Sequence, residues 1–147
     1  MTASGAMADY WRAFGTTPEA LLACAGEFAW RAYAPYSGFP VGAAILAEDG
    51  RMFGGCNVEN ASFGMTICAE RVAMSSAVAA GCRKPLAIAV LSLRPGFCPP
   101  CGACRQFLAE FNPHMEVLLL SENGSMRFHR LDSLLPERFD LERARDG

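Results

Sequence analysis

The sequence predicts one α/β domain, a three-layer sandwich in which helices cover a mixed sheet of about five strands. Three observations support this prediction. The chain has 147 residues, which suits a single domain. Two apolar runs, Leu86–Leu93 and Glu116–Leu120, have the length and composition of strands buried on both faces. Helical patterns separate the predicted strands, and strand–helix–strand order favours parallel neighbours joined by right-handed crossovers.

The first half of the predicted domain is a helix followed by a β-hairpin. Apolar residues recur at helical spacing along Pro18–Ala34, and proline is tolerated in the first turn of a helix. Pro35 is expected to end this helix. Two segments, Val41–Ala47 and Arg51–Val58, flank the turn signal Asp49-Gly50, and this arrangement is typical of a hairpin.

The second half alternates helices with the two buried strands. The alanine-rich segment Cys68–Ala80 is followed by a glycine, which is common just past the end of a helix. Gly102–Phe111 predicts a further short helix. The turn signal Asn123-Gly124 leads into Ser125–His129, so a second hairpin is expected there. Leu131–Phe139 is expected to form a short helix or turn near the end of the chain.

Composition and charge indicate a folded chain and exclude several function classes. The hydrophobic fraction is 52%, which is high for a lone small domain and suggests that a partner subunit covers some apolar surface. The net charge of -2 argues against nucleic-acid binding, and no apolar run is long enough to span a membrane. We expect residues 1–17 to be a partly disordered N-terminal extension and residues 18–147 to form the single domain.

The cysteine and histidine counts bear on location and on metal binding. Seven cysteines, an odd number, occur without a recognisable export signal, so a disulfide framework is not expected. A reducing, cytoplasmic location with some cysteines bound to metal is predicted instead. Only two histidines are present, which excludes a histidine-rich metal site.

Three cysteines and one glutamate form the most informative pattern. Cys101 and Cys104 lie three apart at a predicted helix start, so they face one side, and Cys68 would supply a third thiolate from another helix. Three protein ligands leave a fourth position for water, as in a catalytic zinc site. Glu70 could move protons at that water. Residues two apart on a helix differ by about 200°, so Glu70 and Cys68 can share a site only where their helix begins.

The charge of such a site requires compensation. Three thiolates around Zn²⁺ leave a net charge of about -1, which makes the metal a weaker Lewis acid. The N-termini of two predicted helices would direct partial positive charge at the sulfurs. Arg71 is favoured as a further source of charge and hydrogen bonds to sulfur. Arg105 could serve in the same way or be a surface residue.

The pattern of these cysteines and Glu70 resembles that of the zinc-dependent cytidine deaminases, in particular the short homotetrameric type with three cysteine ligands. The similarity runs from about Ala20 to Phe139, in order and with compatible spacing. The segments that carry it are Tyr36-Ser37-Gly38-Phe39-Pro40-Val41-Gly42-Ala43, Gly55-Cys56-Asn57-Val58-Glu59-Asn60-Ala61-Ser62, Cys68-Ala69-Glu70-Arg71, Pro100-Cys101-Gly102-Ala103-Cys104-Arg105-Gln106, and Leu134-Leu135-Pro136 with Phe139. A cytidine deaminase-like sandwich is the fold that this resemblance implies.

The resemblance also implies roles for individual residues. Cys68, Cys101 and Cys104 would bind one Zn²⁺ per subunit, and Glu70 would be the catalytic acid and base. Asn57 and Glu59 would bind the ribose; residues two apart on a strand face the same side, which agrees with this role. The other implied substrate contacts are Phe39, Ala61, Phe63, which stands where many relatives have tyrosine, and Phe139, which would reach a neighbouring subunit's site.

The implied function is hydrolytic deamination of free cytidine and 2′-deoxycytidine in pyrimidine salvage, by a homotetramer with shared active sites. Two alternatives remain open at this point. One is deamination of a modified cytosine nucleoside of the blasticidin type. The other is an iron–sulfur redox protein, because Cys98, Cys101 and Cys104 have cluster spacing and Cys68 could be the fourth ligand.

Overall fold

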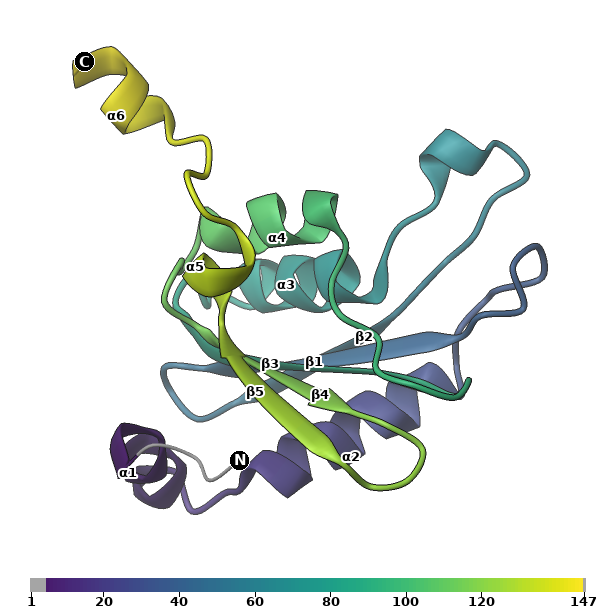
Figure 1. The fold of residues 1–147 in the computed structure, drawn as a ribbon, viewed down its shortest axis with the longest axis horizontal. Helices are drawn as coiled ribbons and strands as arrows, with labels where there is room; N and C mark the ends of the chain where they lie inside the picture. The colour runs from purple at the N-terminus through teal and green to yellow at the C-terminus, as the bar shows by residue number, and fades with distance from the viewer. Residues whose placement is uncertain (1–4, 147) are drawn as a thin grey trace.

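The computed structural model describes residues 5–146 and shows a five-stranded mixed sheet between two layers of helices (Figure 1). Helices α3 and α4 cover one face, and α2 covers the other, which confirms the predicted α/β sandwich. The strands are β1 (Val41–Ala47), β2 (Met52–Cys56), β3 (Pro85–Ser92), β4 (Glu116–Leu120) and β5 (Met126–Arg130). The helices are α1 (Gly5–Ala13), α2 (Pro18–Ala29), the 3-10 helix η1 (Phe63–Met65), α3 (Ala69–Ala79), α4 (Gly102–Ala109), α5 (Leu131–Leu134) and α6 (Leu141–Asp146).

The strand order in the sheet is β2-β1-β3-β4-β5. Strands β1 and β2 form the predicted hairpin, β4 and β5 form the second, and β3 and β4 are parallel neighbours joined through α4. One prediction was wrong: the β2–α3–β3 step does not join neighbours, because β1 lies between these strands and pairs antiparallel with both. Every residue of β1 is buried, whereas β2 is mostly half-buried, so the more apolar strand occupies the interior position.

Alternate residues of the central strands supply two separate cores. On β1, Ala43 and Ile45 pack on the side of α3 and α4, while Ala44 and Leu46 pack on the side of α2. Strand β3 repeats the pattern, with Ile88 among the residues on the α3 side. This alternation follows from the two-residue period of a strand. It explains the unbroken apolar runs, since both faces of the sheet are covered.

Helix α2 begins as predicted and ends earlier than predicted. Thr17 caps its N-terminus, where its side chain accepts a hydrogen bond from Ala20 N, and Pro18 occupies the first turn. The helix ends at Ala29 rather than at residue 34. Tyr33 instead pairs with the chain beyond β2, where its N–H donates to the carbonyl of Asn57 at 3.0 Å. This long-range pairing competes with helix extension and ties the segment to the sheet.

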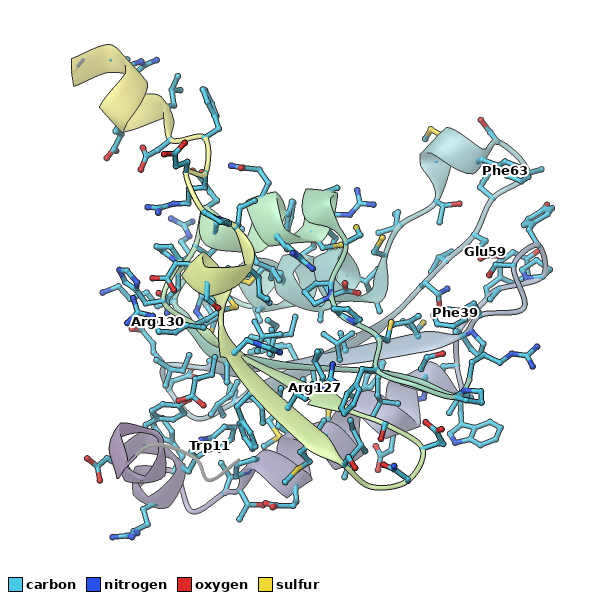
Figure 2. The ribbon with its side chains drawn as sticks, in the orientation of Figure 1. Trp11, Phe39, Glu59, Phe63, Arg127 and Arg130 are labelled. Atoms are coloured by element: carbon cyan, nitrogen blue, oxygen red, sulfur yellow. The ribbon has the colours of Figure 1, made fainter. Side chains whose placement is uncertain are left out.

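The two terminal helices were not predicted from the sequence. Where partial disorder was expected, residues 5–13 form α1, and residues 1–4 lie outside the described part of the chain. Trp11 is only 4% exposed and joins the core on the α2 side, which gives this short helix a packing partner (Figure 2). Helix α6 extends away from the body of the domain (Figure 1). Among the helices formed by residues 5–146, none has both the length and the apolarity needed to span a membrane.

Close packing of two helices against the hairpin depends on glycine. A Cβ atom on Gly42 would lie 1.9 Å from the carbonyl oxygen of Ala25 and 2.5 Å from the nitrogen of Ala29, both in α2. A Cβ atom on Gly55 would lie 2.4 Å from the nitrogen of Ala73 in α3. These neighbours are backbone atoms, which cannot rotate away as a side chain can. The two glycines therefore let α2 and α3 approach the sheet closely.

We predict that Gly42→Ala lowers the free energy of unfolding by at least about 2 kcal/mol, because the added methyl group overlaps the α2 backbone. Urea unfolding followed by circular dichroism measures this change. Gly26→Ala, in α2 itself, is the matched control, since its methyl group meets only Leu91 Cδ2 at 3.9 Å. The control should keep or raise stability by about 0.5 kcal/mol through better helix propensity. Equal stability of the two variants would contradict the packing argument.

Candidate active site and metal centre

Three cysteine thiols lie together where α3 and α4 begin. Cys68 precedes α3 with extended backbone (φ −73°, ψ 152°), and Cys101 precedes α4 in a similar conformation (φ −67°, ψ 168°). Cys104 follows in the first turn of α4 and is fully buried. The three Sγ atoms all lie within 4.8 Å of one another. Within residues 5–146, they form the one group of three or more histidine, cysteine or acidic side chains placed to hold a metal ion.

The spacing and chemistry of these thiols fit a zinc ion. Tetrahedral coordination with Zn–S bonds of about 2.3 Å places sulfur atoms about 3.8 Å apart. The Sγ atoms of Cys68 and Cys101 are 4.0 Å apart. Thiolates are ligands that zinc favours, and three of them leave one tetrahedral position free. The residues present therefore fit a site with one position open to water or substrate.

Neighbouring donors favour the thiolate form of Cys68. A hydrogen bond from the Cys104 thiol and the nearby Arg71 guanidinium lower the pKa of Cys68 to about 5. The Nη2 atom of Arg71 lies 3.5 Å from Cys68 Sγ. The same hydrogen bond, together with burial, raises the pKa of Cys104, so Cys68 ionises before Cys104. The N-terminal ends of α3 and α4 add partial positive charge at this point.

The Glu70 carboxyl group shares a cavity with two of the thiols. Because Cys68 precedes the helix and has extended backbone, the angular separation expected within a helix does not apply to this pair. Glu70 is only 4% exposed, and burial raises its pKa to about 7, so it can accept and donate a proton near neutral pH. The cavity is lined by Val41, Asn57, Thr66, Cys68, Ala69, Glu70, Cys98, Pro99 and Cys101.

Two other side chains close to the ligands have different environments. Arg105 contacts backbone rather than sulfur: its Nε donates to the carbonyl of Pro100 and its Nη1 to the carbonyl of Leu134, each at 2.8 Å. It therefore braces the chain that leads into Cys101. Cys98 lines the cavity but is not one of the three clustered thiols. Burial raises the pKa of Cys98 to about 11, so this thiol stays protonated at neutral pH.

Asn57 and Glu59 both hold the segment that precedes β1. Asn57 Oδ1 accepts a hydrogen bond from Val41 N, and Asn57 Nδ2 donates to the carbonyl of Phe39, both at 2.9 Å. Glu59 accepts hydrogen bonds from the N–H and the hydroxyl of Ser37, which hold the pKa of this carboxyl below its usual range. Asn57 lines the cavity, and Glu59 lines a hollow that adjoins it. Both side chains thus contact residues 37–41.

The four remaining candidate contact residues lie outside the cavity. Phe39 is partly exposed on the same side of the molecule as Glu59 (Figure 2). Ala61 is exposed in the chain before η1, and Phe63 of η1 is 75% exposed, with its ring edge-on to Tyr36 at 5.7 Å. Phe139 is 67% exposed in the segment between α5 and α6, where its carbonyl accepts a hydrogen bond from Gln106 Nε2 of α4 at 3.1 Å. Phe139 is therefore not among the residues that line the cavity.

Sequence reasoning missed two side chains at this site. Thr66 lines both the cavity and the adjoining hollow, and its Oγ1 accepts a hydrogen bond from Asn60 N. It lies two residues before Cys68 in an extended segment, and this spacing could have indicated a shared face. Ser37 holds the Glu59 carboxylate. It lies in a segment that carries the resemblance, but a lone serine gives no signal of which carboxylate it will bind.

Comparisons with known proteins agree with this geometry. Residues 16–120 match the model of the cytidine and deoxycytidylate deaminase zinc-binding region. A cytidine deaminase of Sporosarcina psychrophila is 47% identical over 125 residues, which cover 84% of this chain and 92% of the relative. The crystal structure of a cytidine deaminase from Burkholderia pseudomallei superposes with a TM-score of 0.81 at 48% identity, covering 84% of this chain and 100% of the other.

A second crystal structure extends the comparison. The cytidine deaminase from Mycobacterium tuberculosis superposes with a TM-score of 0.73 at 40% identity, covering 83% of this chain and 96% of the other. The similarity spans nearly the whole of these relatives. The chain belongs to the zinc-binding cytidine and deoxycytidylate deaminase family.

Proposed function

We propose that this chain catalyses the hydrolytic deamination of cytidine and 2′-deoxycytidine to uridine and 2′-deoxyuridine, with release of ammonia, in pyrimidine salvage. One observation carries the proposal: the buried Glu70 carboxyl lies in the same cavity as the thiols of Cys68 and Cys101. A proton-transfer group therefore sits beside a metal site that has an open position. The names of the similar proteins, cytidine deaminases, support the same activity.

The residues of this chain account for the proton movements of the reaction. When bound, zinc supplies the Lewis acidity that activates water near neutral pH. Glu70 accepts a proton from the attacking water and delivers it to the ring nitrogen N3, which makes C4 electrophilic. After attack at C4, Glu70 takes the proton of the new C4 hydroxyl group and passes it to the amino group; the C4–N bond breaks, ammonia departs and the C4 carbonyl of the product forms. A carboxyl group with a pKa of about 7 suits both directions of transfer.

The substrate end of the site favours a free nucleoside. Asn57 and Glu59 would bind the ribose hydroxyl groups, and the free acceptor capacity of a carboxylate suits this role. Phe39 and Ala61 would line the site around the pyrimidine and the ribose, as the family resemblance implies. The net charge of -2 gives the chain no general attraction for a polynucleotide. A panel of cytidine, 2′-deoxycytidine, cytosine and blasticidin distinguishes the proposed activity from deamination of a modified nucleoside.

We also propose that the active enzyme is a homotetramer located in the cytoplasm, with active sites shared between subunits. Apolar side chains are exposed on the chain around η1 and near the C-terminus, where Phe63, Met65, Phe139 and Leu141 are all more than half exposed. Burial of such side chains in subunit contacts would be favourable. Phe139 would then complete a neighbouring subunit's site.

Glu70→Gln should retain zinc and the fold, because the amide has nearly the same shape as the carboxyl group. Its kcat on cytidine should fall by roughly 10²- to 10⁴-fold, since an amide cannot carry the proton. Ammonia release, metal analysis and circular dichroism measure the three quantities. A variant with near wild-type kcat would refute the assigned role of Glu70.

Cys98→Ser should keep stoichiometric zinc and most of the activity, because Cys98 is not one of the three clustered thiols. Cys101→Ser is the matched control and should lose zinc, since it removes a ligand. Metal analysis and the visible spectrum of the purified protein measure the outcome. A brown protein that contains iron and sulfide and bleaches in Cys98→Ser would instead favour the iron–sulfur alternative.

Phe139→Ala should lower kcat/KM at least about tenfold if Phe139 completes a neighbour's site, given the usual contribution of a buried phenylalanine. Mixing this variant with Glu70→Gln, after dissociation and reassembly, should restore part of the activity. In mixed assemblies, one subunit supplies Glu70 and the other supplies Phe139. Light scattering gives the oligomeric state. Monomers with full activity, or mixtures without recovery, would contradict shared sites.

A further inference from the structure

The segment between β3 and α4 forms one wall of the cavity. Within this segment, Cys98 and Pro99 line the cavity and Cys101 provides a thiol of the metal centre. Both ends of the segment are held by arginine side chains. Arg94 Nε donates to the carbonyl of Gly38 at 2.7 Å, and Arg105 holds the carbonyl that precedes Cys101. The middle of the segment, residues 96 and 97, is contacted from the β4–β5 hairpin.

The first contact from the hairpin is made by Glu122. Its Oε2 accepts a hydrogen bond of 2.5 Å from the backbone nitrogen of Gly96. This bond lowers the pKa of Glu122, so the side chain is charged at neutral pH and the bond is charge-assisted. Gly96 has φ +96°, a conformation that L side chains rarely adopt. The carboxylate thus holds the chain at the point where it turns toward Cys98.

The second contact is made by Arg127 of β5. Its guanidinium carbon lies 3.9 Å from the centroid of the Phe97 ring, which is a close cation–π contact. The neighbours of Arg127 on β5, Met126 and Phe128, pack on the α2 side, so Arg127 lies on the face that carries the metal centre (Figure 2). Phe97 itself packs against the core on the α3 side. Arg127 therefore covers the outer face of an anchoring ring.

We propose that Glu122 and Arg127 are positioning residues for the deamination proposed above. They hold Gly96 and Phe97, and through them they set the cavity wall formed by Cys98 and Pro99. Neither side chain lines the cavity, so both act through the backbone of the intervening segment. This inference rests on the proposed function, because the wall that they position is the wall facing the substrate.

The expected consequence is a change in substrate binding rather than in chemistry. Cys104 and Glu70 lie within helices, so their positions do not depend on the hairpin. The wall at Cys98 and Pro99 belongs to an irregular segment that the two contacts keep in place. Without these contacts, part of the binding energy would be used to order the wall, which raises KM.

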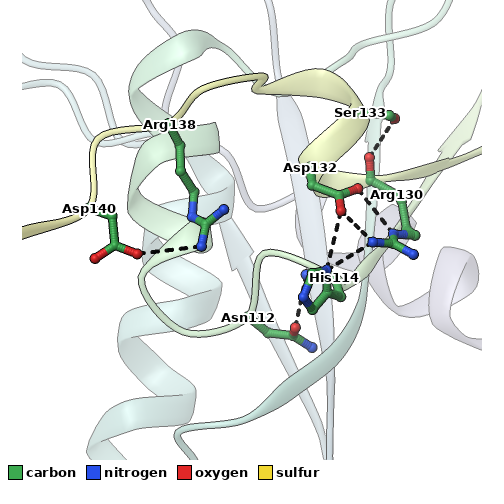
Figure 3. Close-up of polar contacts among 7 residues, drawn as sticks. All are labelled: Asn112, His114, Arg130, Asp132, Ser133, Arg138 and Asp140. Atoms are coloured by element: carbon green, nitrogen blue, oxygen red, sulfur yellow. Dashed lines mark hydrogen bonds and ion pairs between the residues drawn. The ribbon is translucent and has the colours of Figure 1, made fainter. Parts of the chain in front are cut away.

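The experiment compares Arg127→Ala and Glu122→Ala with the wild-type protein. Each should raise KM for cytidine about three- to tenfold and change kcat by less than about twofold. Arg130→Ala is the matched control: Arg130 lies on the same strand and pairs with Asp132 and His114, away from the segment (Figure 3). It should leave KM unchanged. The double variant Glu122→Ala/Arg127→Ala should raise KM by less than the product of the single effects, because both contacts hold one segment.

Conservative variants and zinc release separate positioning from a general loss of structure. Arg127→Lys keeps a cation over the ring and Glu122→Gln keeps an acceptor for Gly96 N, so both should recover most of the wild-type KM. Release of zinc to a chelator should be faster in the two alanine variants than in the wild type and Arg130→Ala, because Cys101 ends the segment. If an alanine variant does not fold, Arg127→Met or Glu122→Met takes its place. Methionine keeps much of the side-chain length but has neither the charge nor an oxygen acceptor, so KM should rise here as well.

Two results would overturn the proposal. One is an unchanged KM in both alanine variants, and the other is an equal rise in Arg130→Ala. A wild-type protein that binds zinc but does not deaminate cytidine would refute the proposed function instead. The chelator rates would then still decide whether the hairpin positions the segment: faster release in the alanine variants supports it, and equal release refutes it.

Discussion

The geometry of the site depends on α3 and α4 beginning side by side at one end of the sheet. The residue just before a helix has extended backbone, so its side chain is free of the helical period. This freedom lets Cys68 point to the same cavity as Glu70, although the two are only two residues apart. It also lets Cys101 and Cys104 face one ion from a single helix start. Gly55 of the hairpin lets α3 lie close enough to the sheet to fix this arrangement.

The same helix starts address the charge of the site. Three thiolates concentrate negative charge beside a carboxyl group that is itself buried, and like charges raise the cost of ionising it. The Cys104 thiol and the Arg71 guanidinium lower the pKa of Cys68, and the helix ends add partial positive charge beside the sulfurs. Glu70 instead lies in the low-dielectric interior, where burial raises its pKa. Separate environments thus give neighbouring acids different proton affinities, which acid–base catalysis requires.

Much of the fold could be predicted from local patterns, and the failures have physical causes. Apolar runs, turn dipeptides and signals at helix ends together predicted the positions of all five strands. The apolar runs are clear because helices cover both faces of the sheet. The insertion of β1 between β2 and β3 was missed because strand order depends on the relative burial of whole strands. The end of α2 was missed because Tyr33 pairs with the chain at Asn57, far along the sequence. The thiol cluster followed from spacing, whereas the Ser37–Glu59 bond depends on tertiary contacts.

The two ends of the site are built from different kinds of structure. The metal end is formed by helix starts packed on a buried sheet, so a single chain fixes it. The proposed substrate end is formed by the chain before β1 and around η1, where Tyr36, Phe63 and Ile67 are exposed. The high apolar fraction therefore reflects these exposed segments as well as the core. The fold of a single chain orders the metal end. The substrate end gains apolar contacts only when another surface covers it. Substrate binding should therefore depend on subunit assembly more strongly than metal binding does.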